Sequence, residues 1–63
     1  MPILTIQMME GRTQKQKDDL IEQVTDAVVN SISSPRENVT VLISEIPKNN
    51  FGIGGVTADK LGS

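Results

Sequence analysis

The sequence contains no cysteine, histidine, tyrosine or tryptophan in its 63 residues. No disulfide can therefore form, and the usual zinc ligand sets cannot be assembled. The absence of histidine also removes the side chain that most often works as a general base near neutral pH. Such a base must then be a carboxylate with a raised pKa, a lysine with a lowered pKa, or the α-amino group, whose ordinary pKa of about 8 starts closest to neutrality.

Aromatic residues and charge of one sign are scarce as well. Phe51 is the single aromatic residue, and the formal net charge is −2 with no basic run. Nucleic-acid binding usually needs a basic patch and stacking aromatics, so we expect no nucleic-acid partner. The sequence has no signal-peptide pattern and no apolar run near the ~20 residues of a membrane span. We therefore expect a soluble cytoplasmic protein with no membrane partner.

The length predicts a single domain over residues 1–63. A lone chain of this size buries only about 60% of the surface that its unfolded form exposes. Small folds compensate with disulfides, a metal or association with copies of themselves. Because the composition leaves only the last of these, we expect a homo-oligomer.

Hydrophobic periodicity predicts two strands joined by one helix. Residues 3–9 and 39–46 place every second side chain on the same face, as strands do. Between them, Thr13 and Gln16 have the spacing of a capping box, and apolar side chains then recur at helical spacing. Ser33-Ser34-Pro35 is expected to stop this helix.

The last part of the chain is expected to be irregular. Residues 47–50 have the composition of a loop, and the glycine-rich residues 51–56 predict a small hairpin or a bent edge strand, with no helix pattern after them. The whole order predicts an α/β fold, a right-handed β-α-β subunit with parallel strands and a short C-terminal hairpin. Such a sheet has one bare face and unpaired edges, which another copy of the chain would cover.

The amino terminus carries the best candidate for a general base. The chain begins Met1-Pro2, and removal of the methionine would leave a secondary amine on Pro2. Burial beside Phe51 and a nearby Arg12 would both lower the pKa of that amine. Arg12 also suits a carboxylate, because its planar fork binds both oxygens. Taken singly, these residues are ordinary: Phe51 as core filler and Arg12 as a solvated turn residue.

Several segments occur together in the order and spacing of one enzyme family. They are Met1-Pro2-Ile3, Glu10-Gly11-Arg12, Gln16-Lys17 with Leu20-Ile21 and Val24, and Phe51-Gly52-Ile53-Gly54-Gly55. Through them the chain resembles the 4-oxalocrotonate tautomerase family from end to end, with essentially no gap. The amino-terminal proline is the most diagnostic element.

The resemblance implies a fold and an assembly. Members of this family are β-α-β subunits that pair into dimers and usually form hexamers, as trimers of dimers. Their reaction uses no metal and no organic cofactor. Their substrates are small oxo or enol acids such as 2-hydroxymuconate or another 2-hydroxydienoate.

The resemblance also implies roles for matching residues. Pro2 would be the general base that carries a proton between an enol oxygen and a carbon. Arg12 of a neighbouring subunit would bind a substrate carboxylate, and Phe51 would line the pocket and keep the amine desolvated. The pocket wall would be completed by the backbone near Met9, Asn38 and Ile53.

The sequence departs from the family at Thr40, where the muconate-type enzymes carry a second substrate arginine. Arg36 lies four residues earlier, ~13 Å away along an extended chain. The basic carboxy-terminal tail of some members is also absent. Loss of one charge-assisted contact costs ~1.5–3 kcal/mol, or more than tenfold in binding or rate. The reaction type is therefore better supported than a dicarboxylate substrate.

Two other functions remain open. A hydratase or dehalogenase would use the same proline and arginine to add water to an unsaturated acid, with Glu10 or Glu45 activating the water. A non-catalytic oligomeric binding protein would result if Met1 were retained, because Pro2 would then have no basic nitrogen.

Overall fold

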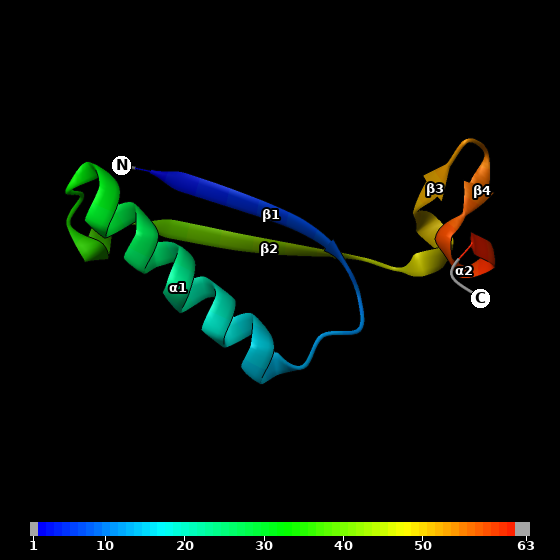
Figure 1. Cartoon of the computed structure of the whole chain (residues 1–63), viewed down its shortest axis with the longest axis horizontal. Coiled ribbons are helices and arrows are strands. Elements are labelled where there is room, and N and C mark those ends of the chain that lie inside the picture. Colours follow the sequence, from blue (N-terminus) through cyan, green and yellow to red (C-terminus); the bar gives the residue numbers. More distant parts are fainter. Residues whose placement is uncertain (1, 62–63) are drawn as a thin grey trace.

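The computed structural model describes residues 2–61. Strand β1 (Ile3–Met9) leads to helix α1 (Gln14–Ile32), which crosses over to strand β2 (Thr40–Ile46). The two strands are parallel, with Ile3 opposite Thr40 and Met9 opposite Ile46. Figure 1 shows α1 lying along one face of this sheet. The predicted β-α-β fold is therefore confirmed.

Helix α1 begins and ends at defined caps. The Thr13 hydroxyl accepts a hydrogen bond from the Gln16 N–H, and Gln16 Oε1 accepts one from the Thr13 N–H, both at 3.1 Å. This reciprocal pair is the capping box that the sequence predicts. At the other end Ser33 adopts the left-handed conformation, with φ 57°, and its N–H donates to the Val29 carbonyl at 3.1 Å. Ser33 thus ends the helix before Pro35 is reached.

The connections contain two short 3₁₀ turns, where the sequence alone predicts no regular structure. Turn η1 (Arg36–Asn38) is closed by the Val39 N–H, which donates to the Arg36 carbonyl at 3.2 Å. Because Val39 makes this bond, β2 begins at Thr40, one residue later than predicted. Turn η2 (Lys48–Asn50) lies within the segment predicted as loop.

The C-terminal arm, residues 47–61, forms a small unit beyond the end of β2 (Figure 1). Strands β3 (Gly52–Ile53) and β4 (Val56–Thr57) pair antiparallel, as the hairpin prediction requires. Gly54 and Gly55 both have positive φ, 61° and 86°, which is typical of a two-residue hairpin turn. The prediction that no helix follows was wrong, because α2 (Ala58–Leu61) forms one turn too short to have a periodic pattern.

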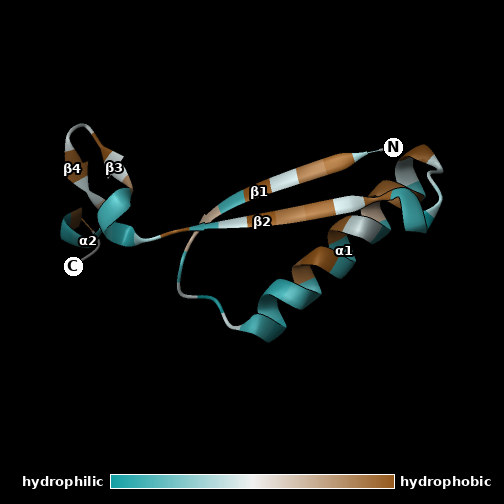
Figure 2. Cartoon of the chain, turned by 180° about the vertical axis from the view of Figure 1, so that it is seen from behind, coloured by the Kyte–Doolittle hydropathy of each residue, from teal (hydrophilic) through white to brown (hydrophobic). Residues whose placement is uncertain are grey.

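The core of a single chain is thin. The helix-facing side chains of β1 and β2, such as Leu4, Ile6 and Ile43, are only half-buried, and within residues 2–61 only Thr25 and Ala58 are fully buried. Figure 2 shows apolar residues along both strands. On the face away from α1, Ile3 is 65% exposed and Leu42 is 53% exposed.

The dimensions of the chain also indicate an incomplete unit. Its radius of gyration is 14.9 Å, with extents of 42 × 24 × 14 Å, whereas a compact domain of this length has a radius of about 11 Å. Its accessible surface is 4711 Å², against roughly 4000 Å² for a folded monomer of this mass. None of the helices within residues 2–61 has the length and apolar character needed to cross a bilayer.

Candidate active site

Pro2 lies at the amino-terminal end of the parallel sheet. Its carbonyl accepts a hydrogen bond from the Thr40 N–H at 3.1 Å, which continues the pairing of β1 with β2. Pro2 is half-buried. Asn38 belongs to η1, two residues before Thr40, and so lies at the same end. The structure therefore places Pro2 and Asn38 at the same end of the sheet.

Met9 and Arg12 lie at the opposite end of the sheet. Met9 is the last residue of β1, and the Glu10 N–H donates to the Ile46 carbonyl at 3.1 Å. Gly11, with φ 125°, then turns the chain toward α1. Seven residue steps of a strand separate Pro2 from Met9 by about 23 Å. Arg12 of one chain is therefore remote from Pro2 of the same chain.

Phe51 and Ile53 lie in the C-terminal arm, beyond the same end as Met9 (Figure 1). The Phe51 carbonyl accepts from the Ala58 N–H at 2.7 Å, and the residue is half-buried. Ile53 is 61% exposed. The six residues expected at the site thus fall into two groups at opposite ends of the sheet, and one chain does not bring them together.

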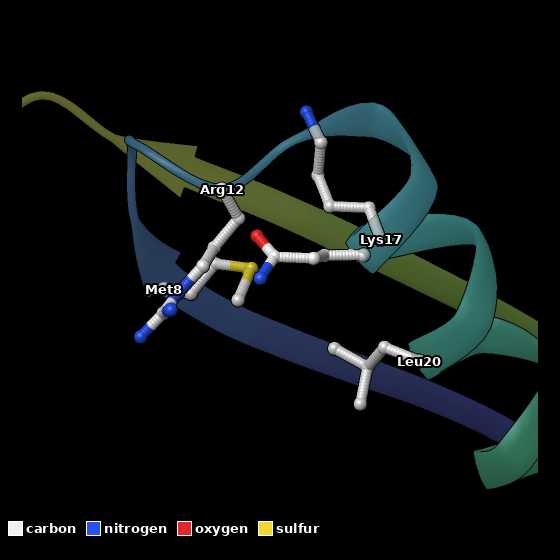
Figure 3. Close-up of a pocket in the computed structure, with 5 residues that line it drawn as sticks. Met8, Arg12, Lys17 and Leu20 are labelled. Atoms are coloured by element: carbon white, nitrogen blue, oxygen red, sulfur yellow. The ribbon is translucent and has the colours of Figure 1, made fainter.

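A hollow of about 240 Å³ adjoins Arg12. It lies between the end of β1 and the first turns of α1, and Figure 3 shows the Arg12 and Lys17 side chains extending in different directions from it. The Lys17 ammonium lies 2.9 Å from a Glu45 carboxylate oxygen. The residues that line the hollow are Met8, Arg12, Gln16, Lys17 and Leu20.

Arg12 is the cation of this hollow whose charge is not compensated. Within residues 2–61, Lys17 is paired with Glu45, while Arg12 makes no ion pair. Arg36, near the other end of the sheet, lies 2.5 Å from Asp26 of α1. Arg36 is therefore already paired with a carboxylate, and Thr40 beside Pro2 is uncharged. In the described part of the chain no three carboxylates are grouped closely enough to hold a metal ion.

Sequence reasoning did not predict that Gln16 and Lys17 line a hollow with Arg12. Lys17 and Glu45 are 28 residues apart, so helical spacing alone cannot reveal the pair. One signal was present. Glu45 follows Val41 and Ile43 on the helix-facing side of β2, where a charged residue needs a partner.

Comparison with known proteins identifies the family. Residues 2–60 match the family model described as "Tautomerase enzyme". The chain belongs to the tautomerase family. It is 54% identical over 61 residues to the 2-hydroxymuconate tautomerase of Pseudomonas sp. (strain CF600), and the match covers 97% of each chain. The tautomerase resemblance drawn from the sequence is confirmed, and with it the assignment as an isomerase.

Solved structures of tautomerases have the same fold. A 4-oxalocrotonate tautomerase isozyme of Methylibium petroleiphilum superposes with a TM-score of 0.90 at 48% identity, covering 98% of this chain and 100% of the other. A heterohexameric 4-oxalocrotonate tautomerase of Chloroflexus aurantiacus J-10-fl gives a TM-score of 0.89 at 31% identity, covering 97% and 98% of the two chains. The β-α-β subunit with its short hairpin is therefore the tautomerase fold.

Proposed function

We propose that this tautomerase interconverts the enol and keto forms of 2-hydroxymuconate or a similar 2-hydroxydienoate, with the Pro2 nitrogen as general base. The match along nearly the whole chain to relatives named 2-hydroxymuconate tautomerase carries the proposal. The position of Pro2 directly before β1, with its carbonyl bound by the Thr40 N–H, supports it, because a base at a strand end is held in place and still reachable by a small acid.

Pro2 can accept a proton only when its nitrogen is a free amine. In a peptide bond that nitrogen has no hydrogen and no basic character. Met1 lies outside the described residues, and in this proposal it is removed. The amine then takes the proton of the 2-hydroxyl group, the electrons shift along the conjugated chain, and the ammonium returns the proton to a chain carbon. Atoms and charge balance without a further reactant.

Arg12 would hold a carboxylate of the substrate. Its guanidinium has no ion-pair partner within residues 2–61 and is exposed beside the hollow. A guanidinium binds both oxygens of a carboxylate in a fixed orientation. Its charge near the substrate would also favour the build-up of negative charge on the substrate's oxygens as the proton leaves.

The remaining site residues would form the wall of the pocket. Phe51, the one aromatic side chain, would exclude water from the amine. Ile53 would add apolar surface, since most of its side chain is exposed in one chain. The backbone near Met9 and Asn38 would close the pocket at the two strand ends.

This site requires more than one copy of the chain. We propose a homo-oligomer, which would be a hexamer made of three dimers. Two copies that pair along the free edges of β1 about a twofold axis have antiparallel strands. Pro2 of one copy then lies beside Met9 and Arg12 of the other. The same pairing would cover unpaired strand edges. The exposed Ile3 and Leu42 give further copies an apolar face to pack on.

Water addition is less well supported than tautomerisation. It needs a carboxylate free to activate water, and Glu45 is paired with Lys17 at 2.9 Å. Glu10 is exposed in the turn after β1 and would lie near Pro2 of a partner copy, as Arg12 does, so it is the carboxylate left to activate water.

The test compares Met1-free protein, verified by mass spectrometry, with a Pro2→Ala variant on 2-hydroxymuconate. Protein that retains Met1 has no basic nitrogen at position 2, and we expect its kcat/KM to fall about 100-fold or more, since a positioned general base contributes roughly 10²–10⁴-fold. Pro2→Ala freed of Met1 keeps a primary amine at the same place, and its kcat/KM should lie between those of the other two proteins. Equal rates for the wild type and the Met1-retaining protein would refute the role of Pro2.

A further inference from the structure

The capping box fixes the orientation of the Gln16 side-chain amide. Its Oε1 accepts a hydrogen bond from the Thr13 N–H at 3.1 Å, and because only the oxygen of an amide can accept, the other atom must be the donor Nε2. The Gln16 backbone N–H also donates to the Thr13 hydroxyl at 3.1 Å, so the backbone and the side chain of Gln16 are both bound to Thr13. Within residues 2–61 no acceptor is bound to Nε2, so its two protons are free.

A glutamine at this position is informative because a glutamate would cap the helix equally well. Both residues supply the acceptor that a capping box requires. A negative charge in the first turn of a helix is also favourable. A glutamate here, however, would put a carboxylate in the same hollow as Arg12 and compete for its charge. Glutamine keeps the cap and leaves Arg12 available to an anion.

The hollow has room for a carboxylate and the first carbons of a small acid. Its volume is about 240 Å³, many times the roughly 10–15 Å³ that one water needs on the same measure. Arg12 and Gln16 supply N–H donors, whereas Met8 and Leu20 supply apolar surface for a carbon chain. The third polar group, Lys17, is already bound to Glu45. The donor groups of the hollow that no carboxylate of the described residues engages are therefore those of Arg12 and Gln16.

We propose that Gln16 is a substrate-binding residue, whose Nε2–H donates to the carboxylate that Arg12 binds. The inference rests on the proposed function, since it takes Arg12 as the carboxylate site. It assigns Gln16 two tasks at once: Oε1 caps α1, and Nε2 recognises the substrate. This second donor gives the site a further polar contact that does not depend on an arginine at position 40.

The test uses two variants: Gln16→Met removes the Nε2 donor without adding a charge, and Gln16→Glu removes the donor, keeps the cap acceptor and adds a carboxylate beside Arg12. Gln23→Glu makes the same charge change at an exposed site on α1, away from the hollow, and is the matched control. Binding is measured with muconate, a dicarboxylate that lacks the 2-hydroxyl group and cannot tautomerise. We expect Kd to rise about tenfold or more in Gln16→Met, as for loss of a hydrogen bond to a charged group, and at least as much in Gln16→Glu, where a carboxylate also competes for Arg12. Gln23→Glu should bind within about twofold of the wild type, as surface substitutions do.

Two further measurements distinguish recognition from folding. The dimethyl ester of muconate has the same carbon chain without the charge, and its binding should be similar in all four proteins. Equal weakening of acid and ester in Gln16→Met would indicate a structural defect and overturn the proposal. In the wild type, the side-chain amide NMR signal of Gln16 should shift on addition of muconate. An unshifted signal, or an unchanged Kd in Gln16→Met, would also overturn it.

These binding measurements do not depend on turnover. If the proposed function fails, the wild type will not convert enol acids. The Kd of muconate at Arg12 and Gln16 can still be measured in that case. If only the role of Gln16 fails, the wild type will be active and Gln16→Met will bind muconate normally.

Discussion

Pro2 is held in the sheet through its carbonyl, which the Thr40 N–H binds at 3.1 Å. Its nitrogen takes no part in that pairing. The group proposed to move protons therefore sits on a backbone that the strand keeps in place. This separation matters because a general base must be positioned without its reactive atom being consumed by a structural hydrogen bond.

The protonation of Pro2 predicts the pH dependence of the reaction. Desolvation beside Phe51 and the charge of Arg12 from a partner copy both disfavour the ammonium form, so the pKa of the Pro2 amine should lie below the ordinary value of about 8. As the pH falls through that pKa, the amine becomes protonated and kcat/KM should decline. A pH–rate profile of Met1-free protein checks this. A profile that is flat across this range would contradict it.

Thr40 should control the preference between dicarboxylate and monocarboxylate substrates. It is exposed next to Pro2 in the sheet, and Arg36 is paired with Asp26, so neither residue offers Pro2 a free cation. We expect Thr40→Arg to raise kcat/KM for 2-hydroxymuconate over that for phenylenolpyruvate by about tenfold, through one added charge-assisted contact. Thr40→Val is the uncharged control. An equal gain on both substrates would contradict the assignment.

At the scale of elements, the cap of α1 anchors the turn that carries Arg12. Gly11 and Arg12 lie between the Glu10 N–H, bound to the Ile46 carbonyl, and the Thr13 capping box. Lys17, with its side chain 17% exposed, adds a link from the first turns of α1 to Glu45 on β2. The position of Arg12 thus depends on how α1 begins.

Thr13→Ala should therefore destabilise the protein by about 1 kcal/mol, the usual effect of losing an N-cap side chain. Thr13→Ser retains the hydroxyl and should stay close to the wild type. Urea unfolding checks the difference, with all proteins at one concentration because the stability of an oligomer depends on it. A Thr13→Ala protein as stable as the wild type would show that the cap contributes nothing.

The sequence predicts well the elements whose bounds are set by residues close to them in the chain. Alternation gives the bounds of β1 correctly, and the spacing of Thr13 and Gln16 gives the start of α1. Less of the C-terminal arm could be predicted. Helix α2 has four residues, and its start is set by the Thr57 hydroxyl bonded to Asp59 and by the Ala58 N–H bonded to Phe51. Contacts of this kind produce no periodicity.

At the scale of the whole molecule, the sequence predicts which residues belong to the candidate site but not where they lie relative to one another. The spacing of Pro2, Arg12 and Phe51 identifies them as family residues without showing that the strand separates Pro2 from the other two. The parallel sheet makes that separation explicit, because Pro2 and Arg12 lie at opposite ends of β1. The long shape and thin core of one chain have the same explanation: the functional unit contains several copies.

The most direct test of this account mixes two impaired forms, protein that retains Met1 and Met1-free Arg12→Ala, that are unfolded and refolded together. If each site takes Pro2 from one copy and Arg12 from another, random mixing restores an intact pair at about one site in four. We therefore predict recovery of roughly a quarter of wild-type activity from the mixture. The same two forms refolded separately and then combined without subunit exchange should stay impaired. No recovery after joint refolding into oligomers would contradict a site shared between subunits.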